Sequence, residues 1–138
     1  MNEVRKTKYP KLIVDEYTSP IEARASAETS LDDCLALIQG RGYRHLPVMD
    51  GEKVLGIISQ RDLNLFKNLA GAKQPIQAKD IMHADPFVVT HDTPLEHVVF
   101  ALSEKKIGSA LVRDEAGKVS GIFTTTDAMN ALIELLHG

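Results

Sequence analysis

Hydrophobic positions along the first half of this chain follow a helical period, then a hairpin pattern, then a helical period again. The first helical stripe consists of Leu31, Cys34, Leu35 and Ile38. Apolar runs at 46–49 and 54–59 follow it, separated by Asp50-Gly51, a pair that favours a tight turn. A last helix is predicted over 62–69, and an extended stretch over 22–27 precedes the other elements. This block therefore predicts the order strand, helix, strand, strand, helix.

A second block repeats this order in the C-terminal half. Its extended stretch is predicted at 86–90, its hairpin at 112–122 and its last helix at 127–136. Its helical stripe consists of Leu95, Val98, Val99 and Leu102. Thr93-Pro94-Leu95-Glu96 predicts a capping box with proline at the first helical position, and Ser30 is a weaker start for the helix of the first block. The glycines expected to follow the two helices are Gly40, Gly42 and Gly108.

The two blocks share a motif of glycine, two apolar residues, a hydroxyl residue, two variable positions and aspartate. It stands at 56–62 and again at 121–127, an offset of 65, whereas matches further upstream have an offset of 64. The extra residue falls in the turn at 114–117, where insertions are tolerated. The chain is therefore an internal repeat of units of about 55 residues, each too small to stand alone. We expect an α+β fold in which two β-α-β-β-α units pack sheet against sheet.

The repeat divides the chain into four parts: an N-terminal arm at 1–17, a first repeat at 18–72, a linker at 73–79 and a second repeat at 80–138. The arm is basic, which fits either a solvated tail or an arm that binds anions. Leu12-Ile13-Val14 could tie the end of the arm onto the core.

Composition narrows the function classes. The chain has 138 residues, a formal net charge of −3, and no run near the ~20 apolar residues of a membrane span. This charge argues against a protein built mainly to neutralise nucleic-acid phosphates. The N-terminus lacks the apolar stretch of a secretory signal, so we expect a cytoplasmic protein that does not enter a membrane. Cys34 is the single cysteine, which excludes an internal disulfide, and its place on an apolar stripe favours a buried structural thiol.

The hydroxyl and aspartate of each motif, Ser59 with Asp62 and Thr124 with Asp127, stand where a strand enters a helix. One interpretation is a helix cap and nothing more, worth about 0.5–2 kcal/mol. The other uses the same geometry for binding. A carboxylate near a helix start can accept hydrogen bonds from two vicinal ribose hydroxyls, while the helix N-terminus favours phosphate beside it. The two interpretations are compatible.

These features together resemble the paired CBS domain, or Bateman module, over about residues 18–138. The resemblance rests on both glycine-to-aspartate motifs and on three further segments: Ser19-Pro20, Tyr43-Arg44-His45-Leu46-Pro47-Val48 and Ile81-Met82-His83-Ala84-Asp85-Pro86. It implies a pseudo-two-fold sandwich of two repeats with a cleft on each side. Members of this family bind adenosine-containing ligands there, such as AMP, ADP, ATP, S-adenosylmethionine or NAD-type dinucleotides. They usually act as regulatory sensors, and their modules commonly pair into discs.

The resemblance also implies which residues share each cleft. The first site would join Ser59 and Asp62 to residues of the second repeat: Met82, Asp85, Phe87, Ile107, Gly108 and Ser109. The second would join Thr124 and Asp127 to residues of the first repeat: Thr18, Ile21, Ala23, Tyr43, Arg44 and His45. Main-chain groups at 107–109 and 43–45 would read the adenine edge, and apolar side chains would sandwich its face.

The two sites differ in the charge they offer a phosphate. Arg61, in the first helical turn after Ser59, can fork onto phosphate oxygens, although an exposed helix-start arginine is an equal alternative. Its counterpart is Thr126, which with Thr125 offers hydroxyls without charge. Arg44 and His45 are bulkier than the family often has, and these cations could instead reach a phosphate chain. We therefore expect unequal occupancy.

No phosphate-cradling loop, histidine pair with metal-ligand spacing or nucleophile with a positioned base is readable in the sequence. We therefore expect no catalytic residue, no metal and no obligatory cofactor. The favoured function is an adenosine-nucleotide sensor that signals through packing of its repeats or of a homodimer to an unidentified effector protein. A ligand-independent dimerisation or interaction module is the main alternative, and a small enzyme is the least favoured.

Overall fold

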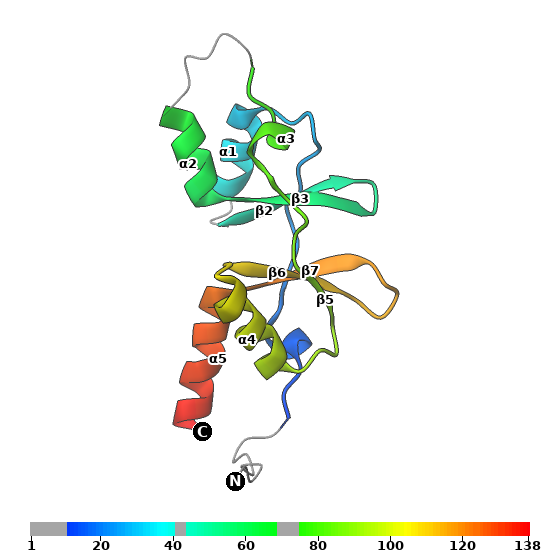
Figure 1. Cartoon of the computed structure of the whole chain (residues 1–138), viewed down its shortest axis with the longest axis vertical. Helices are drawn as coiled ribbons and strands as arrows, with labels where there is room; N and C mark the ends of the chain where they lie inside the picture. Colours follow the sequence, from blue (N-terminus) through cyan, green and yellow to red (C-terminus); the bar gives the residue numbers. More distant parts are fainter. Residues whose placement is uncertain (1–10, 41–43, 69–74) are drawn as a thin grey trace.

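The computed structural model describes residues 11–40, 44–68 and 75–138. Two lobes are stacked along the long axis of the molecule, each with a sheet on its inner side and helices on its outer side (Figure 1). The inner sheets place β2 and β3 of one lobe opposite β6 and β7 of the other (Figure 1). The α+β architecture of two repeats packed sheet to sheet is confirmed.

Each repeat supplies a helix, a hairpin and a second helix to its own lobe. In the first lobe these are α1 (Leu31–Gln39), β2 (His45–Asp50), β3 (Lys53–Ser59) and α2 (Gln60–Asn68). In the second lobe they are α4 (Leu95–Lys105), β6 (Ser109–Arg113), β7 (Val119–Thr124) and α5 (Thr125–His137). Both hairpins are antiparallel, and Gly51 and Gly117 in their turns have the positive φ values that such turns favour.

The opening strands of the two repeats are unequal. The second repeat has β5 (Val88–Thr90), which pairs in parallel with β6, in agreement with the predicted stretch. The stretch at 22–27 was expected to match it, but there the structure has only an isolated parallel bridge from Ala25 to Val48. Two alanines in this stretch, Ala23 and Ala25, point into the core and offer little β-propensity to extend the pairing.

The segment that precedes each repeat joins the lobe of the other repeat. The segment with η1 (Val14–Tyr17) and β1 (Ser19–Pro20) lies on the second lobe, where β1 pairs with β7. The segment with α3 (Ala78–Ile81) and β4 (His83–Ala84) lies on the first lobe, where β4 pairs with β3. The two arrangements are equivalent at an offset of 64. Leu31 N–H donates to the Ile76 carbonyl at 2.9 Å, and Leu95 N–H donates to the Leu12 carbonyl at 2.8 Å.

This exchange also shapes the two hydrophobic cores. Ala78 and Ile81 pack into the core of the first lobe, and Val14, which is fully buried, packs into the core of the second. The prediction that residues 12–14 tie the arm onto a core is therefore confirmed. The predicted domain boundaries stay predictions.

Leu111 shows how the lobes meet. It is fully buried on β6, yet it belongs to neither core, whereas its neighbours Ala110 and Val112 pack into the second lobe. Successive side chains of a strand point to opposite faces, so Leu111 points toward the first lobe. Met49 on β2 is likewise buried outside the first core. Leu111 and Met49 are therefore shielded from water between the two sheets.

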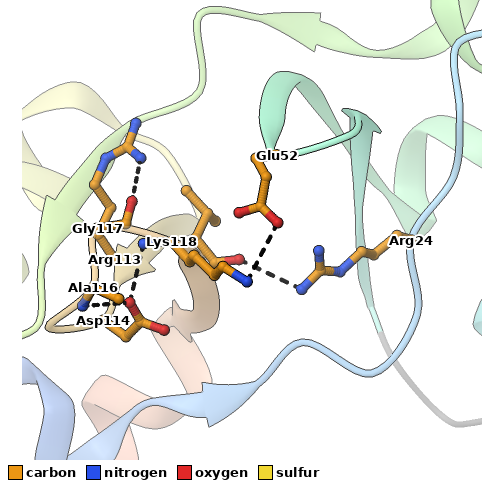
Figure 2. A network of polar contacts seen from close by, with 8 residues as sticks. Arg24, Glu52, Arg113, Asp114, Ala116, Gly117 and Lys118 are labelled. Carbon is orange, nitrogen blue, oxygen red and sulfur yellow. Dashed lines mark hydrogen bonds and ion pairs between the residues drawn. The ribbon is translucent and has the colours of Figure 1, made fainter.

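The hairpin turns bring the lobes together at their edge (Figure 2). Lys118 Nζ of the second lobe lies 3.6 Å from Glu52 Oε1 of the first, and Arg24 donates to the Val119 carbonyl at 3.5 Å. Asp114 Oδ1 organises its own turn by accepting from two backbone N–H groups, those of Ala116 and Lys118. Both side chains of the Lys118–Glu52 pair are exposed, so this contact contributes little stability.

The predicted helix starts are only partly right. Ser30 Oγ accepts from Asp33 N–H at 3.1 Å and caps α1 as expected. The capping box at Thr93 is wrong, because the Thr93 hydroxyl lies 3.0 Å from the Thr90 hydroxyl and the N-cap of α4 is Pro94, which has no side-chain bond. α4 ends on Lys106 in the left-handed region, before Gly108.

The final helix of each repeat begins two residues earlier than predicted, because the motif hydroxyls stand directly before the first turn. Position 69, the predicted end of the first of these helices, and Gly42 lie outside the described residues. In the described ranges, no helix is long and apolar enough to span a membrane.

Candidate functional site

The two motif aspartates sit in matching caps at the starts of α2 and α5. Asp62 Oδ2 accepts from the Ser59 hydroxyl at 2.7 Å and from Ser59 N–H at 3.3 Å. Asp127 Oδ2 accepts from the Thr124 hydroxyl at 3.1 Å and from Thr124 N–H at 2.9 Å. In return, each hydroxyl oxygen accepts from the backbone N–H of its aspartate. The capping interpretation of both motifs is therefore confirmed.

Capping uses one oxygen of each carboxylate and leaves the other free. Within the part of the chain that the structure describes, Oδ1 of Asp62 and Oδ1 of Asp127 accept no hydrogen bond. Both carboxylates are partly buried beside a helix N-terminus, whose unpaired N–H groups favour negative charge. Each cap can therefore offer acceptors to hydroxyl donors and a positive helix end to an anion.

Asp62 meets the segment that leads into the second repeat. β4 lies beside β3, and His83 Nε2 is 3.1 Å from Asp62 Oδ2. Met82 packs against the first core, close to Gly56. Asp85 is exposed and has a positive φ of 57° where the chain turns toward β5. Phe87, also predicted for this site, packs its ring on the second core, with Lys105 Nζ 5.6 Å from its centroid.

Asp127 has the segment that leads into the first repeat beside its strand. Thr18 contacts Gly121 on β7, and Ile21 N–H donates to the Ser120 carbonyl at 2.9 Å. Ala23 lies beyond this contact, with its side chain in the core of the first lobe. Tyr43, the remaining member of this part of the predicted site, lies outside the described residues.

The two repeats face each other at His45 and Gly108. A Cβ placed on Gly108 would lie 3.5 Å from His45 Nε2. Corresponding backbone hydrogen bonds hold the main chain in the two repeats. The Arg44 carbonyl accepts from Gln60 N–H at 2.7 Å, and the Gly108 carbonyl accepts from Thr125 N–H at 3.1 Å. A methyl group at position 108 would be in ordinary van der Waals contact with the imidazole.

Burial lowers the pKa of His45 below its ordinary value of 6.5. Arg44 lowers it further, while Asp62 and Asp127 both act in the opposite direction. His45 thus lies within the field of both cap carboxylates. Nearby, Ser109 is buried on β6 opposite Thr124, and Ile107 packs against the second core.

An open groove of about 490 Å³ runs along the start of α2. Its lining consists of Arg44, His45, Ser59, Gln60, Arg61, Asn64, Leu65 and Asn68. Arg44 and His45, predicted to join Asp127, also line this groove, because the hairpin register places His45 directly opposite Ser59. At the start of α5, Thr125 and Thr126 are exposed.

Two further described residues, Cys34 and His83, have side chains that could take part in chemistry. Cys34 is fully buried, and burial, followed by the nearby Asp33 charge, raises the pKa of its thiol to about 11. His83 was absent from the predicted site although it touches Asp62. Only the β3–β4 register reveals that contact. Among the described residues, no group of three or more histidine, cysteine or acidic side chains could hold a metal ion.

The sequence profile of the CBS domain matches residues 14–66 and 78–134, so the chain belongs to the CBS domain family and carries a pair of these domains. The structure of CBSX2 in complex with AMP is 28% identical with a TM-score of 0.72, over 89% of this chain and 97% of that one. The structure of the CBS-pair protein CBSX2 from Arabidopsis thaliana is 26% identical with a TM-score of 0.77, over 94% of this chain and 99% of that one.

Another similar structure is the CBS domain pair of protein MJ0100 in complex with 5'-methylthioadenosine and S-adenosyl-L-methionine. It is 26% identical with a TM-score of 0.77, over 89% of this chain and 97% of that one. Inosine-5'-monophosphate dehydrogenase of Korarchaeum cryptofilum is 29% identical over 102 residues, which are 74% of this chain and 20% of that protein. The chain spans only 20–25% of the length of the first curated relatives that it matches.

Proposed function

We propose that this chain is a regulatory module that senses an adenosine nucleotide in the clefts between its repeats. AMP, ADP and ATP are the preferred candidates, with S-adenosylmethionine and NAD-type dinucleotides as alternatives. The observation that carries the proposal is the duplicated cap, in which each aspartate keeps one free oxygen beside a helix N-terminus and close to the other repeat. The two hydroxyls of a ribose would donate to that carboxylate, and the phosphate would lie along the helix start. The bound AMP and S-adenosylmethionine in similar CBS pairs support this ligand class.

Charge distinguishes the two clefts. Arg44 and Arg61 both line the groove at the start of α2, where two guanidinium groups can hold a phosphate chain. The corresponding start of α5 has Thr125 and Thr126, which offer hydroxyls without charge. We therefore expect ligands with longer phosphate chains to favour the cleft with Asp62.

Calorimetric titration of AMP, ADP and ATP into the wild-type chain, Asp62→Ala and Asp127→Ala tests the proposal. Each substitution should abolish binding in one cleft and leave the other, so the stoichiometry should fall. Intact nucleotide after long incubation is expected, because the proposal assigns no catalytic step to the chain. No heat with any of the three nucleotides, or affinities and stoichiometry that neither substitution changes, would contradict it.

An exposed apolar face favours a second function, assembly of the chain into a homodimer. On α4 and α5, five apolar side chains are each more than half exposed: Phe100, Met129, Leu132, Ile133 and Leu136. Two of them, Met129 and Leu132, line a groove of about 640 Å³ between residues 11–13, α4 and α5. Contiguous apolar patches on monomers rarely exceed about 300–600 Å². We propose a second copy as the occupant, because α5 supplies both the wall of the groove and protruding side chains, as a self-complementary two-fold contact requires.

The mass of the chain in solution tests this contact. We expect light scattering to give twice the mass of one chain, and Leu132→Glu with Leu136→Glu to give the monomer. Leu65→Glu, an exposed position on α2 of the other lobe, is the matched control and should leave the dimer intact. A monomeric wild type, or a double variant that remains dimeric, would contradict the proposed face.

The two functions can be separated by thermal shift. A ligand at 100 times its dissociation constant stabilises the folded state by about 2.7 kcal/mol, whereas a ligand-independent module shows no shift. In the proposed sensor, a ligand that touches both repeats binds one arrangement of lobes or of two chains better, and so shifts the population toward it. An effector protein would read that change.

A further inference from the structure

The two cap carboxylates differ in one neighbour. Asp62 Oδ2 has His83 Nε2 at 3.1 Å in addition to its two bonds from Ser59. Asp127 Oδ2 has only its two bonds from Thr124, and no cationic side chain of the described residues lies within 4.0 Å of it. The caps are otherwise equivalent, so His83 alone makes the acceptors of the two clefts unequal.

Strand register identifies the counterpart of His83. In the first lobe, His83 on β4 pairs with Ile57 on β3. In the second lobe, Ser19 on β1 pairs with Ile122 on β7. Ile57 and Ile122 are the same position of the repeated motif, so Ser19 stands where His83 stands. The described structure shows no hydrogen bond from Ser19 to Asp127. The difference between the two carboxylate caps therefore comes from a single residue.

From this difference we infer that His83 is a specificity-determining residue that competes with the ligand's ribose for Asp62, so that AMP fills the cleft with Asp127 first. This inference rests on the proposed function. A carboxylate oxygen has about two lone pairs; Asp62 Oδ2 accepts two hydrogen bonds from Ser59 and also has the His83 imidazole 3.1 Å away, whereas among the described residues Asp127 Oδ2 has only its two bonds from Thr124. A pair of ribose hydroxyls needs two acceptor sites. In the part of the chain that the structure describes, Oδ1 is free on both carboxylates, so a second hydroxyl has to share Oδ2, and at Asp62 it meets the imidazole there, which must leave first.

Exposure of the two partners indicates that the imidazole can be displaced. The His83 side chain is 70% exposed, whereas that of Asp62 is 20% exposed. Exposed pairs of this kind contribute about 0.2–1 kcal/mol, which corresponds to an affinity change of about 1.5- to 5-fold. His83 therefore sets the order in which the clefts fill, and it does not close the cleft with Asp62.

The test isolates each cleft and then exchanges the two residues. In an Asp127→Ala background, calorimetric titration with AMP reports the cleft with Asp62. There, His83→Ser should raise the AMP affinity by about 2- to 5-fold. In an Asp62→Ala background, Ser19→His should lower the AMP affinity of the other cleft by a similar factor. His97→Ser, on the exposed surface of α4, is the matched control and should change neither affinity.

The outcomes separate this inference from the proposed function. If the wild type binds AMP and His83→Ser leaves the affinity in the Asp127→Ala background unchanged or lower, the competition is overturned and the sensor stands. Binding that appears in this background only after His83→Ser supports the competition. If neither the wild type nor His83→Ser binds AMP, ADP or ATP, both proposals fall. Far-UV circular dichroism of each variant confirms that it is folded.

Discussion

Gly56 is the position where the exchanged strand β4 approaches the first lobe most closely. A Cβ placed there would lie 2.6 Å from the His83 carbonyl oxygen and 2.8 Å from Met82 Sδ. The thioether can rotate away, but the carbonyl belongs to the strand that pairs with β3. Gly56→Ala therefore forces β4 outward from the strand that it joins.

The size of the effect follows from two opposing terms. Overpacking of this kind costs about 1–3 kcal/mol, because backbone has to shift. Replacing glycine with alanine also restricts the unfolded chain, which offsets about 0.4–1 kcal/mol of that cost. We expect a net loss of about 1–2 kcal/mol in the free energy of unfolding. Urea denaturation followed by far-UV circular dichroism measures it, since the chain has no tryptophan for fluorescence.

The symmetry-related Gly121 provides the control. A Cβ there would meet the Thr18 methyl group first, and the nearest backbone oxygen, that of Ser19, would be 3.4 Å away. Thr18→Ser removes the methyl and keeps the hydroxyl that donates to the Val14 carbonyl. Gly121→Ala should therefore destabilise the wild type but be neutral or stabilising in the Thr18→Ser background. A Gly56→Ala variant with an unchanged urea midpoint and slope would refute the reasoning.

Two further predictions concern titratable groups. Burial lowers the pKa of His45 below its ordinary value of 6.5. As the pH falls through 6.5, the unfolded chain therefore takes up a proton at this residue before the folded chain does. The stability that neutral His45 contributes is complete above pH 6.5 and is lost as the pH falls toward the lowered pKa. His45→Gln should therefore make the urea midpoint less dependent on pH between about pH 7 and 5. If the urea midpoints of the wild type and the variant change in parallel with pH, this role of His45 is excluded. Burial also raises the pKa of the Cys34 thiol to about 11, so a disulfide reagent should label it only after urea unfolds the chain, and rapid labelling of the native protein would contradict the buried placement.

The repeat made most of the fold predictable from the sequence. The helical stripes, the Asp50-Gly51 turn and the two glycine-to-aspartate motifs are local signals, and each appeared twice in the same order. A feature that occurs once can be accidental, but agreement between two copies fixes both the order of elements and the position of the caps. Ser59 with Asp62 and Thr124 with Asp127 were therefore placed correctly at helix starts.

The features that could not be predicted depend on long-range strand pairing, which leaves no local pattern in the sequence. β1 and β4 have two residues each, too few for any hydrophobic period, and each pairs with a strand far away in the chain. Their exchange between lobes could not be predicted for that reason. The same register brings His83 to Asp62, so this contact was missed as well. The capping box predicted at Thr93 failed for a different reason. The local sequence pattern is present, but the Thr93 hydroxyl pairs with the Thr90 hydroxyl instead of capping the helix.

The exchange of leading segments explains how a small ligand could act on the whole chain. Each cap carboxylate belongs to one repeat, but the strand laid beside its own comes from the other, so a ligand that binds Asp62 or Asp127 as proposed would contact both repeats. At the far edge, the lobes are joined by the exposed Lys118–Glu52 pair, which adds little resistance to movement (Figure 2). A bound nucleotide needs only a few kcal/mol of differential affinity to favour one arrangement of lobes. In the proposed sensor, backbone pairing therefore joins the repeats beside the caps, whereas the hairpin turns are joined by a weaker, exposed ion pair.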